Sequence, residues 1–417
     1  MAFLHLRFRF LTVSANALAV ATLLGSLAFS PTVRAQSENS FPPSPLELTE
    51  PDSLIPEAVW EGETDLKPEE RRQLDRALDA LDARAQTAFA QGDTTTAFEL
   101  WNREIRLRRF LGTSAELEAL LRVGSLAWQQ ENFYQAQVIT QRLRQLQTEQ
   151  FEKRETPDVE VLQQLAQAYE EVGARQAALD LLERVLAIAR DRNDSVTEEE
   201  TLRKIARIAL QDLDYEESAA AYRELREMAV ARGDRLSEAY YLTQLAYIYD
   251  QLRWYEDAIA VKQDLEAYYR TLNNIAQMTA LKLAIGDDYA AIGQLNAAVA
   301  EFQDAYRIAW EALQFYRAQE ALDRLAALYE RYNEFDAALQ VYRTQIDVRQ
   351  LARDLYGLMV TYDRIGQLQQ RRQNYGPALE AFRRGLELAR QLGNREAYFQ
   401  VNIETVMQEM STPGNSP

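Results

Sequence analysis

The sequence predicts an all-α fold, an α-solenoid of about eight helical hairpins followed by a C-terminal capping helix. Two ladders of small residues and a scarcity of helix-breaking proline after residue 68 support this prediction. The last six members of the first ladder recur at one constant interval, and a fixed period of roughly 20 to 50 residues is typical of stacked repeats. The first ladder comprises Ala97, Ala136, Ala178, Ser218, Ala258, Ala298, Ala338 and Ala378.

A second small residue precedes every member of the first ladder by twelve positions. Large apolar residues recur three or four positions from each small residue, which places them on one face of a helix. Two such faces per repeat predict a hairpin whose helices approach closely at the small residues. After the eighth hairpin, the segment Arg395–Met410 is predicted to form the capping helix. The second ladder comprises Ala85, Gly124, Ala166, Ala206, Ala246, Gly286, Ala326 and Gly366.

The pattern within one repeat resembles that of tetratricopeptide (TPR) proteins. The sixth repeat carries it as Gly286, Tyr289, Ala298 and Phe302, in the order of the motif L-G-x2-Y…A-x3-F. The resemblance covers residues 69–410. The 40-residue period and the missing proline at the end of the second helix resemble the subclass with longer helices. This resemblance implies a right-handed solenoid whose first helices line a concave groove.

The first 35 residues are predicted to be a secretory signal. Arg7 and Arg9 precede a mostly apolar stretch over residues 10–29, and Val33-Arg34-Ala35 offers a cleavage site before Gln36. The alternative is an uncleaved anchor, because the apolar stretch approaches the length that spans a membrane.

Residues 36–68 are predicted to be a disordered acidic linker, because six of the chain's eleven prolines lie here among Ser, Glu and Asp. An apolar group interrupts the linker. It either caps the first repeat or forms a short docking motif for a partner or for the groove. Its members are Leu54, Ile55, Val59 and Trp60. Residues 411–417 are predicted to be a disordered tail.

The negative net charge of the chain limits the classes of partner that it can bind. Loss of residues 1–35 removes three arginines and no acidic residue, which changes the formal net charge from −18 to −21. Such a chain repels nucleic acid and anionic membrane surfaces, so we expect neither as a partner and no membrane insertion after cleavage.

Residue types also argue against catalysis. His5 is the only histidine, and the chain has no cysteine, which excludes imidazole and thiolate catalysis and zinc sites in residues 36–417. No phosphate-binding motif is present. We therefore expect no enzyme, cofactor or metal site, although chemistry by carboxylates alone stays open.

The resemblance assigns the groove to positions three before and one after the small residue of each first helix. The fourth repeat carries two basic residues at these positions, Arg203 and Arg207. The equivalent positions hold glutamines in the repeat before it and hydroxyl side chains in the repeat after it. Arginine and tyrosine are favoured at interfaces, whereas the spacing of Glu199 and Arg203 equally fits a surface ion pair. The predicted partner site is Gln163, Gln167, Arg203, Arg207, Tyr240, Thr243 and Tyr247.

The sequence therefore predicts a non-enzymatic scaffold that binds a protein or peptide outside the cytoplasm. The expected location is the bacterial periplasm, the cell exterior or, in a cyanobacterium, the thylakoid lumen. The alternative is an assembly or maturation factor for an envelope or membrane complex, anchored in the inner membrane by an uncleaved N-terminal segment. A carbohydrate-active enzyme is the third and weakest interpretation.

Overall fold

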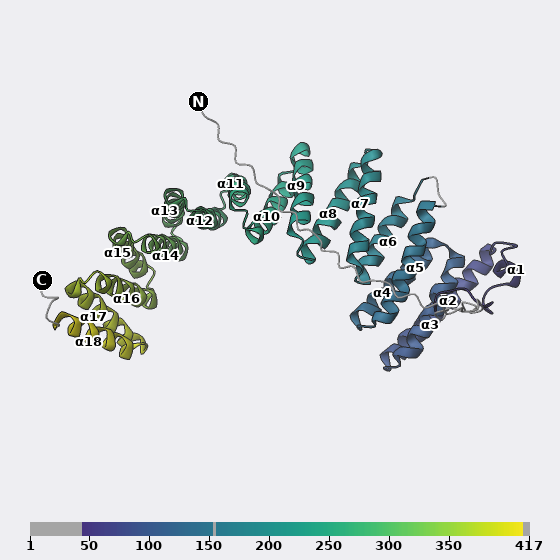
Figure 1. Cartoon of the computed structure of the whole chain (residues 1–417), viewed down its shortest axis with the longest axis horizontal. Coiled ribbons are helices and arrows are strands. Elements are labelled where there is room, and N and C mark those ends of the chain that lie inside the picture. The colour runs from purple at the N-terminus through teal and green to yellow at the C-terminus, as the bar shows by residue number, and fades with distance from the viewer. Residues whose placement is uncertain (1–43, 153–155, 412–417) are drawn as a thin grey trace, which may run out of the picture. The chain divides into compact units, whose positions relative to one another are not determined.

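A computed structural model describes residues 44–152 and 156–411, and the regular structure within these ranges is entirely helical. The predicted signal (1–35), the first part of the predicted linker and residues 412–417 lie outside the described residues. Figure 1 shows the helices following one another in chain order. No helix among the described residues combines the length and the apolar character needed to cross a membrane.

Eight consecutive hairpins make up the repeats, each formed by an even-numbered helix and the odd-numbered helix after it. The first helices are α2 (Pro68–Ala90), α4 (Thr113–Gln129), α6 (Val159–Glu171), α8 (Ser195–Gln211), α10 (Arg235–Leu252), α12 (Ile275–Ala291), α14 (Phe315–Arg331) and α16 (Leu355–Arg371). The second helices are α3 (Thr94–Arg108), α5 (Phe133–Glu152), α7 (Arg175–Asp191), α9 (Tyr215–Arg232), α11 (Tyr255–Thr271), α13 (Leu295–Glu311), α15 (Phe335–Leu351) and α17 (Tyr375–Leu392). The predicted hairpin solenoid is confirmed.

The regular spacing has a local cause in the connections. From α8 to α17 the helices begin at equal intervals along the chain, so corresponding helices of successive hairpins keep a constant separation in sequence. Each connection holds one residue with positive φ, at Leu213, Gly233 and Arg253 for example. The next N–H then reaches back to close the helix, as Asp214 N does with the Ala209 carbonyl at 2.9 Å. Several connections end in an aspartate whose carboxylate caps the following helix.

The small residues lie at the contacts within the hairpins. All eight members of the first ladder are buried, seven of them completely. Two glycines of the second ladder make room for rings, because a Cβ on Gly286 would overlap the ring of Phe302 and one on Gly366 would overlap that of Phe382, while Gly124 makes room for Val172. Each of these rings stands four residues after an alanine of the first ladder. The close approach therefore depends on small residues in both helices.

The N-terminal strap, residues 45–67, packs on the first hairpin and differs from the predicted disordered linker over this range. It contains the short helix α1 (Glu57–Trp60), and Ile55 and Val59 lie buried in one cluster with leucines of α2 and with Leu107 of α3. The ring of Trp60 stacks near Phe110 in the 3₁₀ helix η1 (Arg109–Leu111), with centroids 5.9 Å apart. This packing fits the capping interpretation of the apolar group.

Ion pairs fix the strap further. The Arg103 guanidinium donates two hydrogen bonds of 2.8 Å to the Asp52 carboxylate, and this contact holds the pKa of Asp52 below its usual value. Arg106 donates to the Pro45 carbonyl at 2.7 Å. Composition predicted disorder from the prolines, but these long-range contacts order the segment.

The last hairpin is covered by α18 (Glu396–Ser411), whose bounds differ by one residue at each end from the predicted capping helix. Phe399 and Val406 are completely buried there. Gly385 of α17 leaves room for the Phe399 ring, since a Cβ would overlap it. The core of the last hairpin is therefore covered by Phe399, an aromatic side chain of the capping helix.

Enlarging a ladder residue tests the packing constraint. Ala258 on α11 is completely buried, and we expect Ala258→Leu to destabilise the protein by about 1–3 kcal/mol because no space exists for the added atoms. Chemical unfolding monitored by circular dichroism measures the change. Ala260→Leu is the matched control, because Ala260 lies on the same helix and is exposed. Equal stability of the two variants would contradict the close contact.

Candidate functional site

Three pockets lie where one hairpin meets the next. Each is bordered by two successive first helices and by the second helix between them. The α6–α8 pocket has a volume of about 300 Å³, the α12–α14 pocket about 330 Å³ and the α14–α16 pocket about 460 Å³. We call these three the inter-repeat pockets.

The pockets are built from the same positions of the repeat. The α6–α8 and α12–α14 pockets are lined by residues that occupy equivalent positions three repeats apart. Corresponding pairs are Gln167 and Asp287, Leu182 and Phe302, and Lys204 and Arg324. The recurrence of the pockets therefore follows from the way in which successive hairpins contact each other. The pockets differ from one another in the residue types at their rims.

The predicted partner site is divided by the structure. Gln167 and Arg207 line the α6–α8 pocket together. Arg207 forms an ion pair with Glu170 of the preceding first helix, with one N–O distance of 2.8 Å. This contact raises the pKa of the Arg207 guanidinium. Arg207 therefore joins two repeats, and about half of its side chain still reaches solvent.

Arg203 lies outside this pocket and has partners of its own. Its guanidinium pairs with Glu199 and donates to the Tyr241 hydroxyl at 2.9 Å. The pKa of Glu199 is lowered, chiefly by its hydrogen bond from Arg232 and further by the charge of Arg203. The ion pair between Glu199 and Arg203 fits the surface-pair interpretation of the sequence, while half of the Arg203 side chain stays exposed.

The remaining predicted residues are spread over α6 and α10. Tyr240 and Tyr247 are exposed by 55% and 50%, which leaves two aromatic surfaces available for contact. The Thr243 hydroxyl donates to the Ala239 carbonyl at 2.8 Å and is thereby satisfied within its own helix. The Gln163 side-chain nitrogen is buried without a hydrogen-bond partner.

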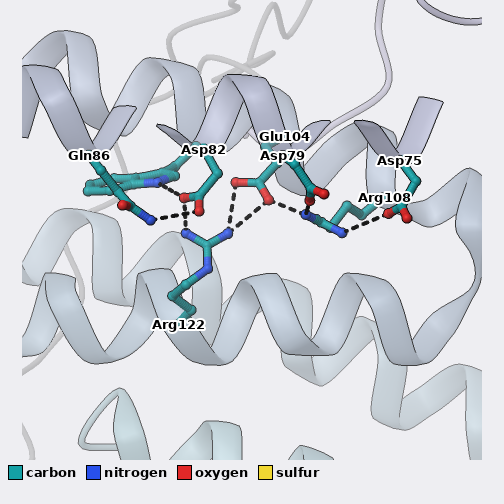
Figure 2. A network of polar contacts seen from close by, with 8 residues as sticks. Asp75, Asp79, Asp82, Gln86, Glu104, Arg108 and Arg122 are labelled. Atoms are coloured by element: carbon teal, nitrogen blue, oxygen red, sulfur yellow. Dashed lines mark hydrogen bonds and ion pairs between the residues drawn. The ribbon is translucent and has the colours of Figure 1, made fainter. Parts of the chain in front are cut away.

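A polar network joins the first hairpin to the second, as Figure 2 shows. At its centre the Glu104 carboxylate of α3 is completely buried. Arg122 of α4 donates to both Glu104 oxygens at 2.8 and 2.9 Å and also pairs with Asp82 of α2. Arg108 Nε donates to Glu104 at 2.7 Å, and its Nη2 donates to Asp79 at 3.0 Å. Burial of the carboxylate is thus compensated by two arginines.

The α14–α16 pocket carries a related set of polar residues. Arg349 of α15 is buried and donates to Asp323 at 2.7 Å and to the Gly357 carbonyl. Gln345 donates its amide to the same Asp323 oxygen at 2.8 Å. On the other side, Tyr342 is buried and hydrogen bonds to Glu330, and both effects raise the pKa of its hydroxyl.

The residues that α15 contributes to this pocket lie outside the predicted partner site, because that prediction rests on first-helix positions alone. A signal for them exists in the sequence. The spacing Asp-x18-aromatic-x2-Glu/Gln-x3-Arg occurs from Asp82 to Arg108 and again from Asp323 to Arg349. Within the described residues, no three His, Cys, Asp or Glu side chains are grouped so as to hold a metal ion.

Comparison with known proteins places a family match on the third hairpin. The model of the tetratricopeptide repeat matches residues 161–196, which hold α6, α7 and the start of α8. A comparison with curated proteins finds no match.

Solved structures of several repeat proteins are similar to parts of the chain. A signal transduction ATPase with a tetratricopeptide repeat sensor from Pyrococcus horikoshii is 18% identical, covering 68% of this chain and 44% of its own, with a TM-score of 0.36. TPR-like repeats of a kinesin light chain from Podosopora anserina are 17% identical over 47% of this chain and 96% of their own, with a TM-score of 0.34. Aspartyl phosphate phosphatase F from Bacillus subtilis is 12% identical over 85% and 97%, with a TM-score of 0.33.

The family match and the hairpin architecture bear on the fold alone. The helix pair matched by the family model recurs in register along the described chain. The third hairpin thus matches the tetratricopeptide repeat, and the described residues form a solenoid of TPR-like helical hairpins.

Proposed function

We propose that this chain is a non-enzymatic scaffold that binds a protein or peptide along its first helices and acts outside the cytoplasm. The observation that carries the proposal is the recurrence of the inter-repeat pockets at equivalent positions. Similar pockets along the repeats suit an extended ligand, because separate side chains of one peptide can enter neighbouring pockets such as the α12–α14 and α14–α16 pockets. A single small substrate has no use for such repetition.

The residue types around these pockets support binding more than chemistry. Exposed tyrosines and arginines lie on α8 and α10, and both types contribute strongly to protein interfaces. Residues 36–417 hold no histidine and no cysteine. The arginines also carry ion pairs between and within repeats, so they rigidify the surface on which a partner would bind.

Action outside the cytoplasm is supported by the sequence of residues 1–35, with its positive start, apolar stretch and small residue before Gln36. The length of the apolar stretch over residues 10–29 favours a second candidate. In that case the segment stays attached as an anchor, and the chain serves as an assembly or maturation factor for an envelope or membrane complex.

Binding at the predicted site is tested with peptides selected from a random library against the full chain. We expect Arg203→Gln combined with Arg207→Gln to weaken the selected peptides by at least about tenfold, or about 1.4 kcal/mol, in isothermal titration calorimetry. Glutamine is preferred to glutamate because a reversed charge would face Glu199 and Glu170. The control pair is Arg223→Gln with Arg226→Gln on α9, and equal affinities for both pairs would contradict this site.

The location is tested by fractionation and N-terminal sequencing of the protein from its native cells. Cleavage of the signal predicts a membrane-free form that begins at Gln36. A membrane-bound form that retains residues 1–35 would instead support the anchored assembly factor. Full-length protein in the cytosolic fraction would contradict both.

A further inference from the structure

The first and seventh hairpins carry the same set of polar positions. In the other six hairpins the position of Glu104 is occupied by Leu, Val, Ala or Gly. The shared set therefore reflects two particular repeats rather than the fold in general. The corresponding pairs are Asp82 and Asp323, Trp101 and Tyr342, Glu104 and Gln345, Arg108 and Arg349, and Arg122 and Arg364.

The two sets of polar residues differ in charge at one position, where the first hairpin has Glu104 and the seventh has Gln345. In the first hairpin the Glu104 carboxylate satisfies Arg108 Nε and the guanidinium of Arg122 at once (Figure 2). In the seventh hairpin Gln345 takes the place of Glu104. The amide of Gln345 donates a hydrogen bond to Asp323 and carries no negative charge.

Of the two groups that Glu104 satisfies, the counterpart of Arg108 Nε is buried without a partner in Arg349, and the counterpart of Arg122 is the exposed Arg364 of the eighth hairpin. Arg349 is 7% exposed, and its Nε is buried without a hydrogen bond. Arg364 lines the same pocket, and the described residues offer it neither a hydrogen bond nor an ion pair. A buried donor without an acceptor destabilises the protein, so Arg349 Nε favours any group that supplies an acceptor.

The acidic residues around the pocket are already engaged. Asp323 accepts from Arg349 and Gln345, and Glu330 pairs with Arg371 and Tyr342. Their presence does not oppose another carboxylate, because Asp82 and Glu104 share Arg122 in the first hairpin. The α14–α16 pocket thus retains an unpaired positive charge and about 460 Å³ of space.

We infer that the α14–α16 pocket is a subsite for a carboxylate, supplied by an acidic side chain of a bound peptide and held by Arg349 Nε and Arg364. The inference rests on the proposed peptide-binding function and specifies the chemistry of the partner at one point. The buried Glu104 side chain is the template for the ligand, since it fills the equivalent place in the first hairpin. The buried Nε of Arg349, which has no acceptor, and the unpaired Arg364 can together select an acidic side chain although the chain as a whole is acidic.

The first test needs no ligand. Gln345→Glu places the absent carboxylate between Arg349 and Arg364, and we expect the melting temperature of the full chain to rise by about 2–4 °C. The reciprocal variant, Glu104→Gln, should lower it by at least as much. Gln340→Glu adds the same charge at an exposed site on α15 and is the control. A Gln345→Glu variant no more stable than the control would overturn the inference, whether or not any partner is found.

The second test uses three probes and ligand-observed saturation-transfer NMR. The first probe is a Gly-Ser peptide with one internal Glu and blocked ends, the second has Gln in its place and a free C-terminal carboxylate, and the third is succinate. We expect the first probe to bind the wild-type chain. Its affinity should fall about tenfold in Arg364→Gln and in Gln345→Glu, and stay unchanged in Arg343→Gln, an exposed control on α15.

The remaining outcomes distinguish the claims. Binding of the second or third probe alone would support a carboxylate site but overturn the side-chain assignment. Absence of binding by all three probes, or binding that Arg364→Gln leaves unchanged, would overturn the site. The proposed function fails separately, if library peptides do not bind while Gln345→Glu still stabilises the chain.

Discussion

Close contact between paired helices is the constraint on which the rest of this structure depends. An alanine or serine of each second helix lies buried at that contact. Where the ladder residue of the first helix is glycine, a neighbouring side chain fills the space of the missing Cβ, which is a phenylalanine ring at Gly286 and Gly366 and Val172 at Gly124. Because the contact recurs at a fixed interval, successive hairpins present equivalent positions to one another. The inter-repeat pockets follow from this equivalence, since the same positions border each of them.

Charged side chains also join neighbouring repeats, in addition to the apolar contacts. Arginines reach from one repeat to carboxylates of its neighbour, as Arg122 does with Asp82 and Arg207 with Glu170. Exposed pairs of this kind contribute little to stability. The Glu104 network differs because its carboxylate is completely buried and would be costly without both arginines.

The fold could be predicted from the sequence because it depends on a local and periodic signal. Small residues at fixed spacing revealed the hairpins, and the predicted capping helix agrees with α18 to within one residue at each end. The strap was harder to predict, since its order comes from contacts such as Asp52 with Arg103 that span 51 residues. Composition contains no information about such contacts.

The candidate sites were predictable only in part, for a geometric reason. Positions along one helix can be inferred from spacing, and Gln167 and Arg207 were found in this way. The α14–α16 pocket combines side chains of three helices, and its important feature is a missing charge. Only a comparison with Glu104 in another repeat, made with both sets of hydrogen bonds known, shows that Gln345 leaves the buried Nε of Arg349 without a partner.

The equal spacing of α8 to α17 has an evolutionary consequence. One hairpin with its connections makes up one repeat of constant length. Duplication or loss of one repeat would therefore leave the hairpins on either side of the change in register. Because each pocket is bordered by two adjacent units, such an event would change the ligand preference only at the new junction. Recombination could thus diversify what this protein recognises one pocket at a time, without a new fold.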